Sequence, residues 1–197
     1  MIIKSIKEKN KNNSILVIDD KEYILSTDIV VEYFLFKGKE INIDTLNEII
    51  SLNDEYLMFN KMKNYLLRYQ ANEKKIRMKL IDNNISFNST NNIIERLKKI
   101  GLLNDDKFID SFISSLIRKG NGENLIRQKL FDKGFENNLI SSKLKDIRCD
   151  EYYEALNKMY NKALKNYKED EGYQKVQKVK KYLLSRGYTY QDINDIS

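Results

Sequence analysis

The stretch Leu125–Phe135, LIRQKLFDKGF, contains the pattern that decides the fold. Its apolar residues Ile126 and Leu130 are four positions apart, as on one face of an amphipathic helix, and a glycine follows the helix. The pattern occurs again as KIRMKLIDNNI (75–85) and as KVKKYLLSRGY (178–188), which begin 50 residues earlier and 53 residues later. A pattern that recurs at this interval predicts a tandem array of similar units.

Equivalent positions of the three copies carry similar side chains. Each copy has two apolar positions on the helix, a turn that favours left-handed backbone, and an apolar residue that folds back after the turn. We expect the apolar residues to form the core of each unit. The matching sets are Ile76, Ile126 and Val179, then Leu80, Leu130 and Leu183, then the turn residues Asn84, Gly134 and Gly187, and last Ile85, Phe135 and Tyr188.

Each copy has a longer helical pattern before it and a second short one after it. We therefore predict a mainly α protein, an elongated tandem array of three three-helix, helix-turn-helix-like repeats. The predicted domains are an N-terminal αβ cap at 1–54 and repeats at 55–104, 105–149 and 150–197.

The cap differs in pattern from the rest of the chain. Residues 14–26, SILVIDDKEYILS, read as a β-hairpin that turns at the two aspartates, and 2–6, IIKSI, suggest a third strand. A helix is expected from residue 27 to its terminator Gly38, followed by a separate short helix at 44–51.

Composition excludes several classes of chemistry. The 197 residues include no histidine and one cysteine, Cys149, so the chain has no imidazole base, no Cys-His pair and no zinc site of the usual kind. The apolar runs are too short for a membrane span or a signal peptide. We expect a cytoplasmic, non-enzymatic protein, monomeric and without cofactor or metal.

Positive charge is concentrated in the middle of the chain. Residues 1–60 carry 7 basic and 11 acidic side chains, residues 61–148 carry 19 and 10, and residues 149–197 carry 9 and 8. The net charges are therefore −4, +9 and +1. Such a centre favours a polyanion or an acidic protein surface, while a merely solvated lysine-rich face remains the alternative.

Two motifs resemble binding sites but have simpler explanations. Asp105, Asp106 and Asp110 could be metal ligands, yet the first two lie where acids favour the dipole of a helix capped by Asn104 or Asp105. The stretch KGNGENL (119–125) lacks the Gly-Lys-Ser/Thr ending of a phosphate loop and reads as a turn.

The basic residues around this turn are the candidate functional site. We hypothesise that Gly120 and Gly122 keep the turn tight, so that basic side chains converge on one face and recur in the third repeat, as Arg127 and Lys180 do at equivalent positions. Gly134 and Gly187 are turn residues. The predicted partner-binding residues are Arg118, Lys119, Arg127, Lys129, Lys133, Lys180, Lys181 and Arg186.

The segment Arg96–Phe135 resembles the central signature of the RecX regulatory proteins. A run of Gly101, Leu102, Leu103, Asp105, Asp106 and Phe108 is followed by a turn and helix with Arg118, Lys119, Gly120, Gly122, Ile126, Arg127 and Leu130. The ending Tyr182–Ile193 and the hairpin IDDKEYILS (18–26) are also similar to this family, so the resemblance covers nearly the whole chain. The first repeat departs from it at Ala71-Asn72 and at the turn Asn83-Asn84-Ile85.

The resemblance implies a modulator of the recombinase RecA. Such a protein binds the RecA–DNA filament, most commonly inhibits its recombinase, ATPase or coprotease activity, and acts in DNA repair, recombination and the SOS response. Direct non-specific DNA binding by the helix-turn-helix-like repeats is the alternative, and both hypotheses use the same basic residues.

Overall fold

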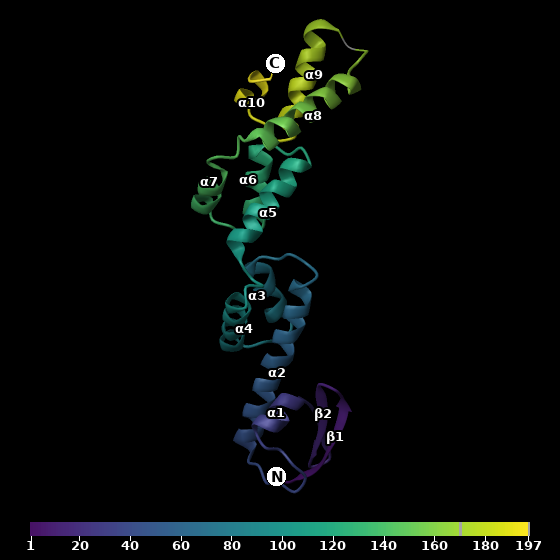
Figure 1. Ribbon diagram of the computed structural model, residues 1–197, viewed down its shortest axis with the longest axis vertical. Coiled ribbons are helices and arrows are strands. Elements are labelled where there is room, and N and C mark those ends of the chain that lie inside the picture. Colours follow the sequence, from purple (N-terminus) through teal and green to yellow (C-terminus); the bar gives the residue numbers. More distant parts are fainter. Residues whose placement is uncertain (170, 197) are drawn as a thin grey trace. The chain divides into compact units, whose positions relative to one another are not determined.

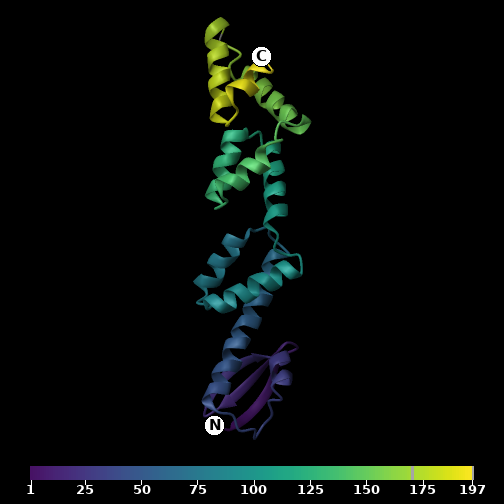
Figure 2. The same ribbon diagram turned by 90° about the vertical axis from the view of Figure 1, so that its left-hand side faces the viewer.

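The computed structural model describes residues 1–169 and 171–196 and is mainly α-helical, with a small antiparallel sheet (Figures 1 and 2). It divides into two compact units, Met1–Leu103 and a second that begins at Asn104. The first contains β1 (Ile3–Asn10), β2 (Asn13–Ile18), β3 (Lys21–Ser26), α1 (Thr27–Glu32), α2 (Ile43–Leu66), α3 (Glu73–Asp82) and α4 (Phe87–Lys99). The second contains α5 (Asp105–Arg118), α6 (Glu123–Asp132), α7 (Asn137–Leu144), α8 (Asp150–Asn166), α9 (Gly172–Ser185) and α10 (Tyr190–Asn194).

The sheet has the strand order β1-β2-β3, which confirms the predicted hairpin and the third strand. Asp19 and Asp20 turn the chain between β2 and β3 with φ of 45° and 66°, as a two-residue hairpin of type I′ requires. Lys39 and Gly38 pair with the outer edge of β1, because Ile3 donates to the Lys39 carbonyl (3.0 Å) and accepts from the Gly38 amide (2.8 Å).

α1 is shorter than predicted, and the expectation that it runs to Gly38 was wrong. Phe34 takes a left-handed φ of 46°, and the Leu35 amide reaches back to the Val30 carbonyl (2.9 Å). This closure turns Leu35 into the apolar cluster under the sheet, where it is 6% exposed. Burial of the leucine ends the helix without a glycine.

α2 is one helix of 24 residues, so the predicted break between 44–51 and the following helix was also wrong. The predicted boundary at residue 54 falls inside it. Ser51–Asp54 include neither glycine nor proline to break the helix. Contacts of Asn53 with β3 also stabilise the helix here. The buried Asn53 side chain accepts from the Ser26 amide (2.7 Å) and donates to the Ile24 carbonyl (2.9 Å), which fastens α2 to β3.

The three aligned copies occupy equivalent places in their repeats. The six apolar helix positions of the copies are at most 3% exposed, and Phe135 and Tyr188 are buried while Ile85 is half-buried. The turn residues Asn84, Gly134 and Gly187 have φ of 57°, 89° and 88°. Each copy is therefore the middle helix of a three-helix group: α2-α3-α4, α5-α6-α7 and α8-α9-α10.

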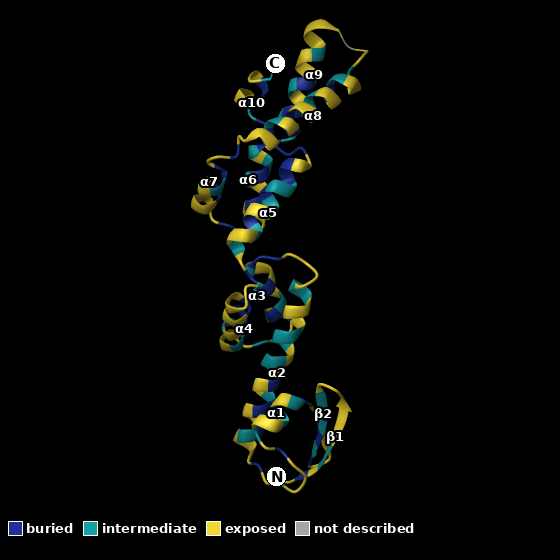
Figure 3. Ribbon diagram, viewed as in Figure 1, coloured by how far each residue is buried: buried dark blue, intermediate teal, exposed yellow. Residues whose placement is uncertain are grey.

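Both units contain buried residues (Figure 3), and these group differently in the two. In the first unit the sheet and the α2-α3-α4 group have separate apolar clusters. In the second unit a single cluster contains residues of both groups, from Ile109 in α5 to Ile193 in α10. The second and third repeats are thus packed as one body.

Candidate interaction surface

The turn between α5 and α6 is where the second and third repeats meet. Lys119 ends α5, Gly120 has a left-handed φ of 72°, and the buried Asn121 side chain donates to the Leu116 carbonyl (2.8 Å). Gly122 then begins α6 without a side-chain cap. Its own amide donates instead to the Arg186 carbonyl of the third repeat, at 2.8 Å.

Gly122 is required by close packing against backbone, and Gly120 mainly by its left-handed φ. A Cβ on Gly122 would lie 2.3 Å from the Tyr188 amide nitrogen, and one on Gly120 would lie 2.6 Å from Met159. Gly187 is equally restricted, because its Cβ would lie 2.4 Å from the Cβ of Leu125. The segment that approaches this turn so closely is the third repeat.

The Arg186 side chain binds within this contact between the repeats and does not extend away from it. Its guanidinium donates through Nε to the Gly120 carbonyl (3.1 Å) and through a second nitrogen to the Lys119 carbonyl. These carbonyls lie at the C-terminal end of α5, where the helix dipole favours a cation. Arg186 therefore holds the third repeat on the second.

A buried polar cluster joins the same two repeats. Asp192, with no exposed side-chain surface, accepts from Arg148 (2.8 Å), from the Tyr152 hydroxyl (2.9 Å) and from the Thr189 amide (2.7 Å). The Tyr152 hydroxyl in turn accepts from the Glu123 amide (3.2 Å) at the start of α6. Burial alone would raise the pKa of Asp192, but the hydrogen bonds from these groups outweigh it and lower the pKa.

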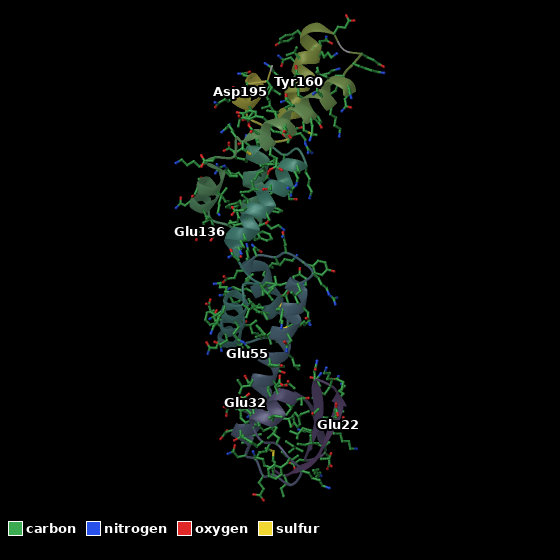
Figure 4. All side chains as sticks on the ribbon, viewed as in Figure 1. Glu22, Glu32, Glu55, Glu136, Tyr160 and Asp195 are labelled. Atoms are coloured by element: carbon green, nitrogen blue, oxygen red, sulfur yellow. The ribbon has the colours of Figure 1, made fainter. Side chains whose placement is uncertain are left out.

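Neighbouring tyrosines belong to the same packing. Tyr152 and Tyr188 meet edge to face with ring centroids 5.5 Å apart, and burial raises the pKa of Tyr188 to about 12. Tyr153 extends the contact at the surface by donating to Asp195 (3.3 Å), which is labelled in Figure 4. The cluster thus connects α8 with α10 as well as with α6.

The arginine repeated in the first two copies closes each repeat internally. Arg77 pairs with Glu73 (2.6 Å) and donates to Asn91 of α4 (2.7 Å). Arg127 pairs with Glu123 (3.2 Å) and donates to Ser141 of α7 (2.9 Å) in the same way. This arginine therefore joins the middle helix of its repeat to the last.

Each of these glutamates also binds a second cation. Glu73 pairs with Lys98 (3.0 Å), and Glu123 pairs with Arg148 (3.1 Å). Burial raises the pKa of Glu73, but Lys98 and Arg77 outweigh that effect and lower it. The equivalent of this arginine in the third copy is Lys180, which has Val176 in place of the glutamate. The predicted repeated basic position is real, but in two repeats its charge is balanced within the repeat.

The other predicted basic residues lie at the surface. Lys119, Lys133 and Lys181 are exposed, Lys129 and Lys180 are half-exposed, and Arg118 makes a loose, exposed pair with Glu151 (3.7 Å). The Lys133 ammonium lies 5.6 Å from the centre of the Phe112 ring. Lys119 is two helical turns beyond Phe112 on α5, and Lys129 is one turn before Lys133, so these lysines share a side of the α5-α6 pair.

The acidic motif is a helix start, as predicted. The Asn104 side chain caps α5 by accepting from the Lys107 amide (2.9 Å), and Lys143 of α7 pairs with Asp106 (3.2 Å) and Asp110 (2.9 Å). Within residues 1–169 and 171–196, no group of three carboxylate or thiol side chains is placed to hold a metal ion. None of the helices described there is long and apolar enough to cross a membrane.

The cluster of Tyr152, Arg148 and Asp192 was not predicted from the sequence. One local signal was available, since Thr189 and Asp192 have capping-box spacing and do form such a box at the start of α10. The partners of Asp192 lie 40 and 44 residues away, at Tyr152 and Arg148, and no local pattern connects them.

Comparison with known proteins shows one family. A family model described as "RecX, third three-helix domain" matches residues 150–196. "Regulatory protein RecX" of Clostridium perfringens (strain SM101 / Type A) is 32% identical over 206 residues, which cover 98% of this chain and 93% of the relative. The protein of the same name from Streptococcus sanguinis (strain SK36) is 31% identical over 190 residues, covering 93% and 71%.

Solved structures agree with the fold. A "Crystal structure of regulatory protein RecX" superposes with a TM-score of 0.76 at 21% identity, covering 98% of this chain and 97% of that one. The "Crystal structure of RecX from Lactobacillus salivarius" gives a TM-score of 0.67 at 25% identity, covering 74% and 95%.

Proposed function

Because this chain belongs to the RecX family of regulatory proteins, we propose that it binds the RecA–DNA filament and inhibits the activities of the recombinase. It would act in DNA repair, recombination and the SOS response. The observation that carries the proposal is a set of five surface lysines in the second unit, three exposed and two half-exposed. We define this lysine surface as Lys119, Lys129 and Lys133 of the second repeat with Lys180 and Lys181 of the third.

The lysine surface has the chemistry that a filament of protein and DNA would recognise. Long, exposed ammonium groups attract phosphates or carboxylates over a distance set by the ionic strength. Arg118, loosely paired and mostly exposed, can exchange Glu151 for an acidic group of a partner. By contrast, Arg127 and Arg186 are engaged within the protein and serve to hold the repeats that present the surface.

We propose a regulator without catalytic activity of its own. A protein that binds one state of the filament better than another shifts the population towards that state, and no covalent step is needed. Inhibition follows if the bound state is one that hydrolyses ATP or exchanges strands more slowly. Occupancy of the filament, rather than turnover, then sets the size of the effect.

The test is binding to RecA assembled on single-stranded DNA with a slowly hydrolysed nucleotide, measured by co-sedimentation over a series of salt concentrations. We expect saturable binding that weakens as salt rises, and a parallel fall in the ATPase rate of RecA under turnover conditions. Failure of the parent protein to sediment with the filament at about 0.1 M salt would contradict the proposal.

Direct DNA binding is the second candidate, and the lysine surface supports it as well. The same titration on bare single- and double-stranded DNA separates the two functions. A DNA-binding protein would bind bare DNA as tightly as the filament, with a logarithmic salt dependence set by the number of phosphates contacted. A filament-binding protein would bind bare DNA much more weakly.

A further inference from the structure

A second site lies in the first unit, separate from the lysine surface. It is a polar cavity of about 440 Å³ between α2, the start of α1 and the turn from β1 to β2. This volume is within the range of pockets that bind small molecules or short peptide segments, roughly 300–1,000 Å³. Four of its nine lining residues are asparagines: Asn12, Asn13, Asn60 and Asn64.

Asn53, on the same helix, shows how α2 binds an extended chain. Its side-chain amide accepts from the Ser26 amide (2.7 Å) and donates to the Ile24 carbonyl (2.9 Å), two residues apart on the outer edge of β3. One primary amide thus satisfies both a donor and an acceptor of a strand that has no further strand beside it. The contact uses only the main chain of the strand, so it is independent of side-chain identity.

Asn60 and Asn64 continue the row of amides that Asn53 begins. They follow it by seven and eleven residues, two and three helical turns, and therefore lie on the same side of α2. Among the described residues their side chains make no hydrogen bond, and both line the cavity. Four residues of helix rise about 6 Å, close to the 6.6–6.8 Å that two residues of an extended chain span. Asn60 and Asn64 would therefore meet alternate peptide units of one strand.

Charge in the cavity does not favour nucleic acid. Lys11 supplies one cation among the lining residues, and Asp28, which accepts a hydrogen bond from Tyr56, supplies one anion. These two charges offset each other, so the lining of the cavity carries no net positive charge for a phosphate backbone. Uncharged amides that offer both donors and acceptors instead match the alternating groups of a polypeptide main chain.

We propose that this cavity binds an extended polypeptide segment of the recombinase through its main chain, with Asn60 and Asn64 bridging peptide groups as Asn53 bridges Ile24 and Ser26. This inference rests on the proposed function, which identifies the recombinase as the partner. It adds a second contact, in the first unit, that is insensitive to salt because no ion pair is involved. The lysine surface then governs encounter, and the amide row holds one strand of the partner.

The experiment uses the full chain and an array of overlapping twelve-residue peptides that span the RecA sequence. Because the contact is made to the main chain, we expect peptides that favour extended backbone to bind the parent protein, and Asn60→Asp and Asn64→Asp each to weaken that binding by about tenfold. Each substitution keeps the shape, replaces the amide donor with a charged acceptor, and removes no hydrogen bond formed among the described residues. Asn47→Asp, an exposed substitution on the same helix outside this cavity, is the matched control and should bind like the parent.

The outcomes separate this inference from the proposed function, because filament binding is measured in parallel. If the filament binds but no peptide does, or if Asn60→Asp and Asn64→Asp bind peptides like Asn47→Asp, the cavity is not a peptide site. Failure of the parent protein to bind the filament overturns both proposals. Binding of single-stranded oligonucleotides that is lost in Asn60→Asp but not in Asn47→Asp would replace the peptide with a nucleobase.

Discussion

The main chain of Gly122 touches that of Tyr188, so closely that a methyl group on the glycine would lie 2.3 Å from the tyrosine amide nitrogen. The two residues are far apart in sequence and come from different repeats. Hydrogen bonds from Gly122 to Arg186 (2.8 Å) and from Asn124 to Gly187 (2.9 Å) complete the contact. The second and third repeats are therefore joined backbone to backbone, which leaves no tolerance for a side chain at the junction.

Gly122→Ala should destabilise the second unit by about 3 kcal/mol, because overpacking displaces a backbone segment that cannot move aside. Gly122 has a φ of −83°, which alanine adopts freely, so the loss would report the contact alone. Thermal unfolding followed by circular dichroism measures it. Gly172→Asn is the control, since a Cβ added there would meet no atom of the described residues within 4 Å beyond its chain neighbours, and asparagine tolerates its φ of 55°. Equal losses in the two variants would refute the contact.

Asp192→Asn should cost the second unit about 2 kcal/mol, because it removes the charged acceptor of a buried cluster while Arg148 keeps its pair with Glu123. Chemical denaturation at neutral pH gives the value. Arg148→Lys is a useful companion, since lysine keeps the charge but cannot bond both Asp192 and Glu123 in the same geometry. A neutral result for Asp192→Asn would show that the carboxylate is dispensable.

The same carboxylate predicts how stability depends on pH. The pKa of Asp192 in the folded protein lies below its ordinary value of 3.8, so the unfolded chain binds the proton first as pH falls. The stability that Asp192 contributes is thus fully present above about pH 4 and is lost as pH falls towards the folded pKa. Unfolding free energies between about pH 5 and pH 2.5 should fall more steeply for the parent than for Asp192→Asn. Parallel curves would contradict this assignment.

Lys119→Gln, Lys133→Gln and Lys181→Gln together should leave stability unchanged, because exposed charges contribute little to it. The triple variant should bind the RecA filament at least about tenfold more weakly at low salt, where charge pairing counts most. Co-sedimentation measures the binding. A triple variant at Lys7, Lys9 and Lys21, exposed lysines of the N-terminal strands, removes the same charge elsewhere and should bind like the parent. Equal weakening in both would indicate a net-charge effect rather than a site.

Arg127→Ala should behave in the opposite way. Loss of the contacts to Glu123 and Ser141 should lower the stability of the second unit by about 1 kcal/mol, while filament binding changes little. Arg77→Ala should reproduce the stability loss in the first unit, because Arg77 makes the equivalent contacts there. Hydrogen exchange read out by mass spectrometry assigns each loss to its unit. Strong loss of filament binding in Arg127→Ala, with stability unchanged, would instead place Arg127 in the binding surface.

The sequence was sufficient to predict the repeated groups, because their signals are local. Spacing of Ile126 and Leu130, with a left-handed turn at Gly134, specifies a helix and its end within eleven residues. The ends of α1 and α2 were not predictable in this way. Leu35 ends α1 by folding into the core, and Asn53 stays helical because its amide binds β3, which are tertiary effects that override local propensity.

The sequence predicted which basic residues lie around the candidate site, but not what each of them does. Basic residues around the Gly120–Gly122 turn are present, yet sequence could not distinguish Lys119, which is exposed, from Arg186, which binds the end of α5. Charge alone does not reveal whether a partner lies within the fold. That information resides in contacts such as Arg186 to Gly120, 66 residues apart.

Because α2 is continuous, it connects the sheet rigidly to the helical group of the first unit. A helix of 24 residues is a stiff strut of about 36 Å, and it carries the sheet at one end and α3 and α4 beside the other. Glu55, labelled in Figure 4, braces it laterally by reaching Arg96 of α4 (3.7 Å). Because α2 is not interrupted along its length, it fixes both the distance and the orientation of the sheet relative to the α2-α3-α4 group. A rotation of the sheet would therefore turn α3 and α4 with it.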